Sequence, residues 1–357
     1  IEYHNLVPYA EWMNGSVLLL HRSDYGCCNT LLAEQVGMLG RYTEAFFPEL
    51  VYVRPQGQIE KRDSLEGSAF IDFPVDQTMI YPDYRRNTAE LGKIQSSIDS
   101  VRNDTDITIT SVWLKGYASP EGSYAHNKEL AIGRTAALKR YIQQLYRFEG
   151  DVITTDYEPE DWAGLRYYVE QSNLAHRAEI ITLIDGNLEP DAREWKIKRD
   201  YPMEYSFLLQ NCYPALRHTD YRIAYTIRSY SDVEEIKRIM CERPQKLDLN
   251  EFYLAAQEYE PGTDEFTEVF ETAVRMFPDD TIANLNAANA AMRRGDLTSA
   301  KRYLAKADDS PEAVYARGAL AIRQKDYDSA RRYLNEAKSL GLEQAGITLE
   351  QLEKGRR

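Results

Sequence analysis

A nine-residue pattern near the C-terminus recurs after 30 residues, and no other feature of the sequence constrains the fold as strongly. Asp296 to Leu304 aligns with Asp326 to Leu334, and small residues stand at equivalent places in both copies. Such repeats form pairs of antiparallel helices, each of which buries its apolar face only against its neighbours. We therefore expect an all-helical array over residues 247–357, with an earlier unit at about Leu247 to Asp280.

The composition sets limits on the partners. The chain has 357 residues, of which 43% are hydrophobic and 28% charged, as in folded proteins with two or three domains. Its 43 basic and 57 acidic side chains give a net charge of −14, which disfavours binding to the phosphates of nucleic acid. The aliphatic run Val17 to Leu20 is far shorter than a membrane span requires. Neither nucleic-acid binding nor a membrane-spanning segment is expected.

Residues 66–231 alternate between strand and helix patterns, which is typical of helices packed on a mixed sheet. Asn87 is expected to cap one helix, with Glu90 in the capping-box position, and a second helix is expected to span about Tyr124 to Tyr146. Three amphipathic stretches then predict a helical insertion at about 158–213. The expected strands are Ala69 to Ile80, Ile107 to Leu114, Val152 to Asp156 and Tyr221 to Ile227.

Residues 1–65 favour a small β-rich region. Short apolar runs occur at Val17 to His21 and at Leu50 to Val53, and a helix is expected at about Leu31 to Phe47. The fold class predicted for the whole chain is α+β. It consists of a β-rich N-terminal region, a mixed α/β sandwich with a helical insertion and an all-α array.

The stretch from Gly116 to Arg134 is the strongest candidate for a site, because a Gly- and Pro-containing loop leads directly into a helix. Asn127 and Arg134 are seven residues apart and so lie on one face of that helix, among apolar residues. A guanidinium on an apolar face needs a carboxylate, a phosphate or backbone carbonyls beside it. Two interpretations follow. Arg134 and the loop form a shallow pocket for an anion, or Arg134 pairs with an acidic residue of a neighbouring strand and only ties helix to sheet.

The same stretch resembles the signature of the OmpA C-terminal-like family, in which a Gly-containing loop precedes Asn, Leu and an Arg-Ala pair on a helix. Gly116, Gly122, Asn127, Leu130 and Arg134 stand at matching spacings. The resemblance implies that family's fold from about Ala69 to Ile227. It also implies binding of the diaminopimelate of peptidoglycan stem peptides, through a loop aspartate and the helix arginine.

The sequence departs from this signature at the loop aspartate, where Ser119 stands instead. Glu121 replaces the missing acid only if the loop turns it inward, and Thr135 stands where Ala is usual. The loop resembles those of envelope proteins from the Bacteroidetes, which implies a periplasmic, outer-membrane-associated protein. The ligand-binding residues implied by the resemblance are Arg134, Asn127, Ser119, Glu121 and Gly122.

The repeats resemble tetratricopeptide repeats, which implies a concave groove for a peptide or a partner protein. An array that only braces the neighbouring domain is the alternative. We therefore expect a cell-envelope scaffold that contacts peptidoglycan through its OmpA-like domain and an envelope protein through its repeats. The alternative is an accessory or assembly factor for a surface structure such as an adhesin or fimbria, with a vestigial pocket.

Nothing in the sequence predicts an enzyme, a cofactor or a metal. The five histidines show no metal-ligand spacing, and there is no nucleophile elbow, P-loop or dinucleotide fingerprint. No catalytic residue is therefore expected. Cys212 and Cys241 leave two readings open, a disulfide in an oxidising envelope or two buried thiols, of which the second is favoured.

Overall fold

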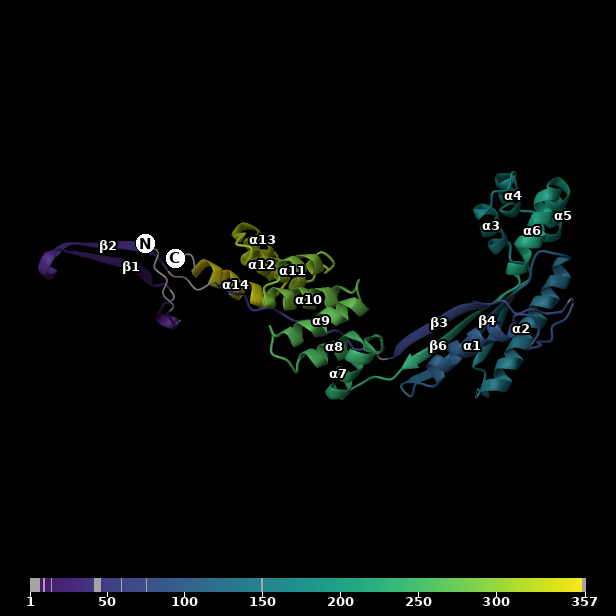
Figure 1. Cartoon of the computed structure of the whole chain (residues 1–357), viewed down its shortest axis with the longest axis horizontal. Helices are drawn as coiled ribbons and strands as arrows, with labels where there is room; N and C mark the ends of the chain where they lie inside the picture. Colours follow the sequence, from purple (N-terminus) through teal and green to yellow (C-terminus); the bar gives the residue numbers. More distant parts are fainter. Residues whose placement is uncertain are drawn as a thin grey trace. The chain divides into compact units, whose positions relative to one another are not determined.

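A computed structural model describes residues 7–8, 10–13, 15–41, 46–58, 60–74, 76–148 and 150–354. The chain forms two compact units (Figure 1). We call Ile59–Ser229 the sheet unit, and Ile1–Gln58 together with Tyr230–Arg357 the repeat unit. The described residues contain helices and two small sheets, so the fold class is α+β, as predicted.

The sheet unit is built on four strands in the order β3, β6, β4 and β5. The central strand β6 runs antiparallel to both β3 and β4, whereas β4 and β5 are parallel. The predicted pairing of the Tyr221 to Ile227 segment with the Ile107 to Leu114 segment is confirmed. The strands are β3 (Lys61–Ala69), β4 (Ile107–Tyr117), β5 (Ile153–Glu158) and β6 (Thr219–Ile227).

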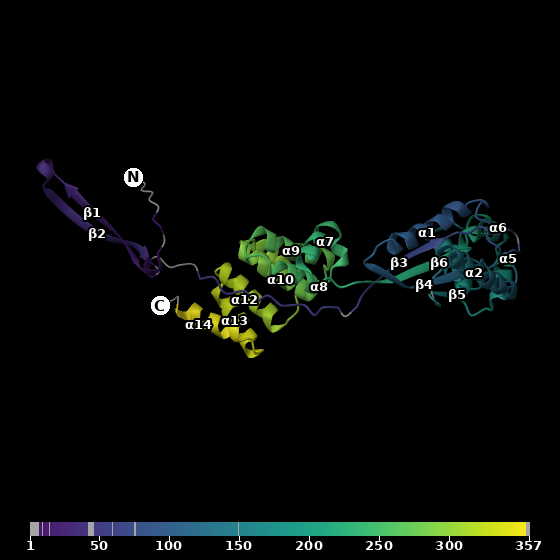
Figure 2. The same ribbon diagram turned by 90° about the horizontal axis from the view of Figure 1, so that it is seen from below.

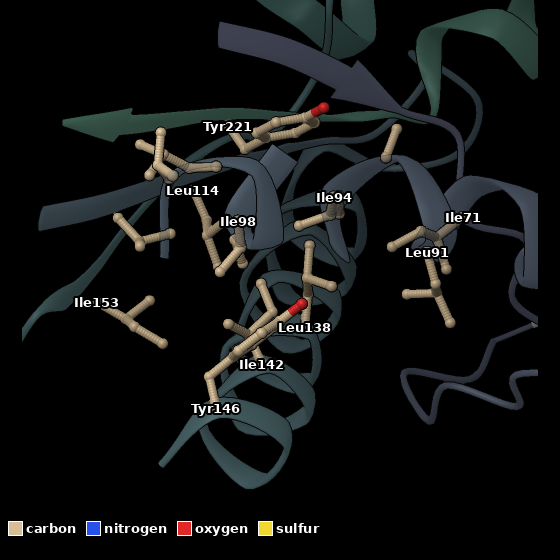
Figure 3. Packing of buried hydrophobic residues seen from close by; sticks show 14 of the residues in the cluster. Ile71, Leu91, Ile94, Ile98, Leu114, Leu138, Ile142, Tyr146, Ile153 and Tyr221 are labelled. Carbon is tan, nitrogen blue, oxygen red and sulfur yellow. The ribbon is translucent and has the colours of Figure 1, made fainter. Parts of the chain in front are cut away.

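Helices α1 (Asn87–Arg102) and α2 (Tyr124–Tyr146) pack on this sheet and form its core with it. Figure 3 shows Ile94 and Ile98 of α1 and Leu138 of α2 meeting side chains of the strands. Periodic aliphatic residues on each helix therefore supply the buried face, as the sequence predicts. The ends of α2 agree with those expected from the sequence.

Residues 158–213 are mostly helical, which confirms the predicted insertion. These helices have a hydrophobic cluster of their own, centred on Leu165, Ile180 and Tyr213. The insertion joins β5 to β6. Its helices are α3 (Trp162–Gln171), α4 (Arg177–Ile184), α5 (Pro190–Asp200) and α6 (Pro202–Asn211).

The C-terminal part of the repeat unit consists of helices that pack on their neighbours in sequence, and no strand lies between residues 250 and 350, all of which are described. The 30-residue repeat reappears in the helix caps, since Asp296 and Asp326 accept hydrogen bonds from the backbone N–H groups of Ser299 and Ser329. The helices are α7 (Val233–Glu242), α8 (Leu249–Ala256), α9 (Asp264–Met276), α10 (Thr281–Arg294), α11 (Leu297–Leu304), α12 (Pro311–Arg323), α13 (Tyr327–Ser339) and α14 (Glu343–Lys354).

None of the helices that the structure describes combines the length and the apolar character of a membrane span.

Strands β1 (Val17–Tyr25) and β2 (Leu31–Arg41) form a hairpin, so the helix expected at Leu31 to Phe47 is wrong. Residues 42–45 of that expectation lie outside the described residues. The antiparallel pairing of β1 with β2 outweighs the local helical pattern, and the two glycines within β2 disfavour a helix. Large apolar side chains of the hairpin are exposed, including Leu32 at 69% and Met38 at 68%.

Two other strand predictions are wrong. Leu50 to Val53 has no regular structure, and β3 ends at Ala69, where a strand to Ile80 was expected to begin. The region expected to form a domain at residues 1–65 is also divided. Residues 46–58 pack with the repeat helices, and Lys61–Ala69 is a strand of the large sheet.

The sequence suggested that Asn87 caps α1, but this prediction is wrong, because Arg86 takes the N-cap position. Instead, Asn87 is buried and its amide spans the loop before the helix. It accepts a hydrogen bond from the Asp72 N–H (2.7 Å) and donates to the carbonyls of Asp72 (2.9 Å) and Tyr81 (2.8 Å). Glu90 likewise accepts from the Phe70 N–H at 2.9 Å. Both side chains therefore hold residues 70–81 rather than the helix end.

We predict that Asn87→Ala destabilises the sheet unit by about 2–3 kcal/mol, because it leaves buried backbone groups without partners. Hydrogen exchange of the β4 amides measures this locally, without assuming two-state unfolding of the whole chain. Asn103→Ala, at an exposed position just after α1, is the matched control. Equal protection in the two variants would contradict the role assigned to Asn87.

Candidate functional site

The candidate site lies where the end of β4, the start of β6 and helix α2 meet. Gly116 pairs with Thr219, and the Tyr117 N–H donates to the His218 carbonyl at 2.9 Å. A Cβ atom on Gly116 would lie 1.8 Å from the Thr135 hydroxyl oxygen, so glycine is needed for α2 to approach β4. This close approach positions Arg134 of α2 beside the strand ends.

Arg134 is half-buried, and within the described part of the chain no carboxylate lies within ion-pair distance of it. Its guanidinium lies over the Phe73 ring, 5.0 Å from the centroid, and its Nε donates to the Gln77 carbonyl at 3.4 Å. Burial lowers the pKa of Arg134, and the positive charge of Arg217 lowers it further, against the attraction of Asp76. The ion pair with a neighbouring strand, one of the two interpretations of Arg134, is not formed by the described residues.

A second cation, Arg217, connects this pocket to the loop after β4. Its Nε donates to the Ser119 hydroxyl at 2.9 Å, and its Nη2 forms an ion pair with Glu121 at 2.5 Å. Ser119 is only 4% exposed, whereas Glu121 is exposed. The loop therefore turns Glu121 toward Arg217, so that this acid neutralises a neighbouring guanidinium.

His218 adds an unsatisfied polar atom to the same place. Its ring stacks on Tyr117, with centroids 4.3 Å apart, and its Nε2 lies 3.5 Å from Asp220. Its Nδ1 is buried and has no hydrogen-bond partner among the described residues. An unpaired buried nitrogen is costly unless water or a ligand meets it.

These residues enclose a small cavity of about 10 Å³, which is near the space that one water molecule needs. Two guanidiniums, a histidine ring and the aromatic ring of Phe73 surround it. The positive charge and the guanidinium donors of this lining favour a carboxylate or a similar small anion. The lining residues are Ile71, Phe73, Gly116, Tyr117, Arg134, Arg217, His218 and Thr219.

Two of the expected ligand-binding residues have structural roles instead. Asn127 is 2% exposed, and its amide donates to the Glu160 carboxylate at 2.9 Å. Burial raises the pKa of Glu160, against the hydrogen bonds from Asn127 and Trp162. Gly122 has a φ of +93°, so it serves the turn before α2. Both residues shape the loop and do not line the cavity.

Of the five residues expected to bind a ligand, only Arg134 lines the cavity, and Ser119 and Glu121 act through Arg217. Sequence reasoning missed Arg217 as a site residue and did not connect His218 to the site. The available signal was their position directly before β6. In an antiparallel pair the start of one strand adjoins the end of the other. The predicted pairing therefore places these two residues beside the loop after β4.

Other chemistry is not evident in the described residues. They contain no cluster of three His, Cys, Asp or Glu side chains that could hold a metal ion. Cys212 is buried, as expected, but Cys241 is exposed, because it lies on the solvent side of α7, and both thiols are free. The expectation of two buried thiols is therefore wrong for Cys241.

A scan against protein-family models finds no match for this chain, and a search of curated proteins finds none either. The resemblance to OmpA C-terminal-like domains therefore rests on the residues of the Gly116 to Arg134 motif.

Proposed function

We propose that this protein is a non-enzymatic scaffold of the cell envelope, in the periplasm and associated with the outer membrane. In this proposal the pocket at Arg134 binds a carboxylate of the peptidoglycan stem peptide. The helical repeats serve a protein partner of the envelope. The resemblance to envelope proteins supports the compartment, and the positively charged pocket together with that resemblance supports the ligand class.

One observation carries the proposal. Arg134 is a half-buried guanidinium without a carboxylate partner in the described chain, and it lies close enough to Arg217 for that charge to lower its pKa. Two neighbouring cations repel each other, and a bound anion relieves this repulsion while forming charge-assisted hydrogen bonds. The unpaired Nδ1 of His218 supplies a further polar contact at the same cavity. The site is therefore suited to an anion before any ligand arrives.

A second candidate function is favoured by the loop. Ser119 carries no charge and Glu121 is paired with Arg217, so the attraction of this loop for the ammonium group of a diaminopimelate end is reduced. If this loss abolishes wall binding, the domain serves as a platform in an accessory or assembly factor for an adhesin- or fimbria-like structure.

We predict that Arg134→Ala weakens co-sedimentation of the full chain with purified peptidoglycan by roughly ten- to a hundredfold. The reason is the loss of a charge-assisted contact of about 1.5–3 kcal/mol. Arg140→Ala is the matched control, because Arg140 is exposed on the same helix and its removal changes the net charge equally. If the wild type does not sediment, or if both variants behave alike, the platform function takes first place.

We also predict that Ser119→Asp weakens the binding of a soluble dicarboxylate severalfold, because the added negative charge neutralises Arg217. Ser119→Asn is the neutral control of similar size. Pimelate and diaminopimelate share a carbon chain, but only diaminopimelate carries ammonium groups. Titrating each into both variants therefore separates binding through a carboxylate alone from binding that also involves an ammonium group. A higher affinity of Ser119→Asp for diaminopimelate would show instead that the pocket binds an ammonium group.

A further inference from the structure

Residues 46–58, which we call the strap, lie along the repeat helices although more than 200 residues separate them in sequence from α10. Figures 1 and 2 show this segment as a dark trace passing the helices of the repeat unit. It has no regular secondary structure of its own. Its backbone is therefore free to bond to side chains rather than to a neighbouring strand.

The helices hold the strap through its main chain. Asn286 of α10 makes two hydrogen bonds with Val53, since its Oδ1 accepts from the backbone N–H at 2.8 Å and its Nδ2 donates to the carbonyl at 2.7 Å. Asn289 donates to the Val51 carbonyl at 2.7 Å. Tyr315 of α12 donates to the Glu49 carbonyl at 2.6 Å. Three alternate carbonyls of the strap are thus bound by two helices, α10 and α12.

The spacing of these contacts explains how a helix can bind an extended chain. Asn286 and Asn289 are three residues apart, so they lie on one face of α10. Residues two apart in an extended segment present their backbone groups to the same side, as Glu49, Val51 and Val53 do here. Asn286 and Asn289 thus reach Val53 and Val51 from one face of α10, and their contacts go to backbone groups, which every residue type except proline supplies in full.

Two aromatic side chains anchor the strap beside the backbone contacts. The Tyr52 ring packs against Phe266 and Phe270 of α9, with centroids 5.1 and 5.6 Å away. The guanidiniums of Arg293 and Arg323 lie 5.1 and 4.6 Å from the centroid of the Phe47 ring. Phe46, Leu50, Val51 and Val53 also pack against hydrophobic clusters of the repeat helices, so side-chain contacts along the strap add to the backbone hydrogen bonds.

Asn286 and Asn289 have no evident purpose in the helical core itself. Both are 1% exposed on an Ala-rich helix, where alanine or leucine would pack without the cost of burying an amide. Among the described residues, the side-chain hydrogen bonds of both asparagines go to the strap. Their placement therefore makes sense for binding a peptide backbone.

We propose that this face of the repeats, formed by α10 and α12 with α9 beside it, is a binding site for an extended peptide, and that the strap occupies it as an intramolecular ligand. The ligand is an extended segment with an aromatic residue between the two residues that Asn289 and Asn286 hold. A second molecule's strap has this pattern, so it competes for the site. The inference is independent of wall binding and is tested with peptides alone.

The experiment converts the strap into a separate peptide within the full chain. Sites for a sequence-specific protease are placed at residues 43 and 59, so that cleavage frees the strap while residues 60–357 stay continuous. We expect the cut strap to co-elute with the protein in gel filtration. A labelled synthetic peptide of residues 46–58 then exchanges with it, which fluorescence anisotropy follows.

Two matched pairs test the asparagine contacts. In the protein, Asn286→Ala with Asn289→Ala should weaken peptide binding by roughly tenfold or more, whereas Asn335→Ala, at an exposed position on α13, should not. In the peptide, N-methylation at Val53 removes the N–H that donates to Asn286 Oδ1, and it should abolish exchange. N-methylation at Gln56, whose N–H has no acceptor among the described residues, should leave exchange intact.

Three outcomes overturn the proposal. The first is immediate loss of the cut strap from the wild-type repeats. The second is retention without any exchange, or loss of helical circular dichroism on cleavage, either of which makes the strap a permanent part of the core. The third is exchange that is equally fast in the Asn286→Ala, Asn289→Ala variant.

Discussion

The sheet unit depends on the pairing of β6 with two strands at once. β6 is antiparallel to β3 along one edge and to β4 along the other, so segments beginning at residues 61, 107 and 219 share one set of backbone hydrogen bonds. The helical insertion between β5 and β6 is accommodated because the chain re-enters the sheet in a fixed register. That register sets Arg217 and His218 against Tyr117 and within reach of Arg134.

The pocket differs in charge from the one that the family resemblance implies. An aspartate opposite an arginine suits a group that carries both an amine and a carboxylate. Here Ser119 accepts a hydrogen bond from a second arginine, and Glu121 neutralises part of that charge from the solvent side. The result is a cavity whose polar lining is mainly cationic. Arg134 contributes a guanidinium that forms no ion pair with a carboxylate of the described residues.

Local signals in the sequence were sufficient for much of the fold and little of the site. Helix α2 combines a Ser123 cap with periodic apolar residues, so both of its ends could be predicted. The strand Leu31–Arg41 could not, because its conformation follows from pairing with β1 rather than from its own pattern. Asn87 looked like a cap from its neighbours in sequence, whereas its partners lie in a loop that precedes it.

The same limit applies to contacts between distant segments. Arg134 was identified because a motif surrounds it, but Arg217 lies 98 residues from Ser119 and carries no local signature. The strap read as a short β-type run, since its apolar residues resemble those of a strand. Its partners are asparagine amides 233 and 238 residues away, and no periodicity relates them to Val53 and Val51.

The two ends of the repeat unit that lead into the sheet unit are both fixed at the start of α8. The Gln58 N–H donates to Asp248, the N-cap of α8, and the Tyr230 N–H donates to Glu251, three residues further on. Within the sheet unit, the first and last strands are paired so that Lys61 faces Ile227. Residues 59–229 thus have the topology of an inserted cassette whose entry and exit lie together. Joining residue 58 directly to residue 230 would remove this cassette and leave the strap and the repeat helices in their order.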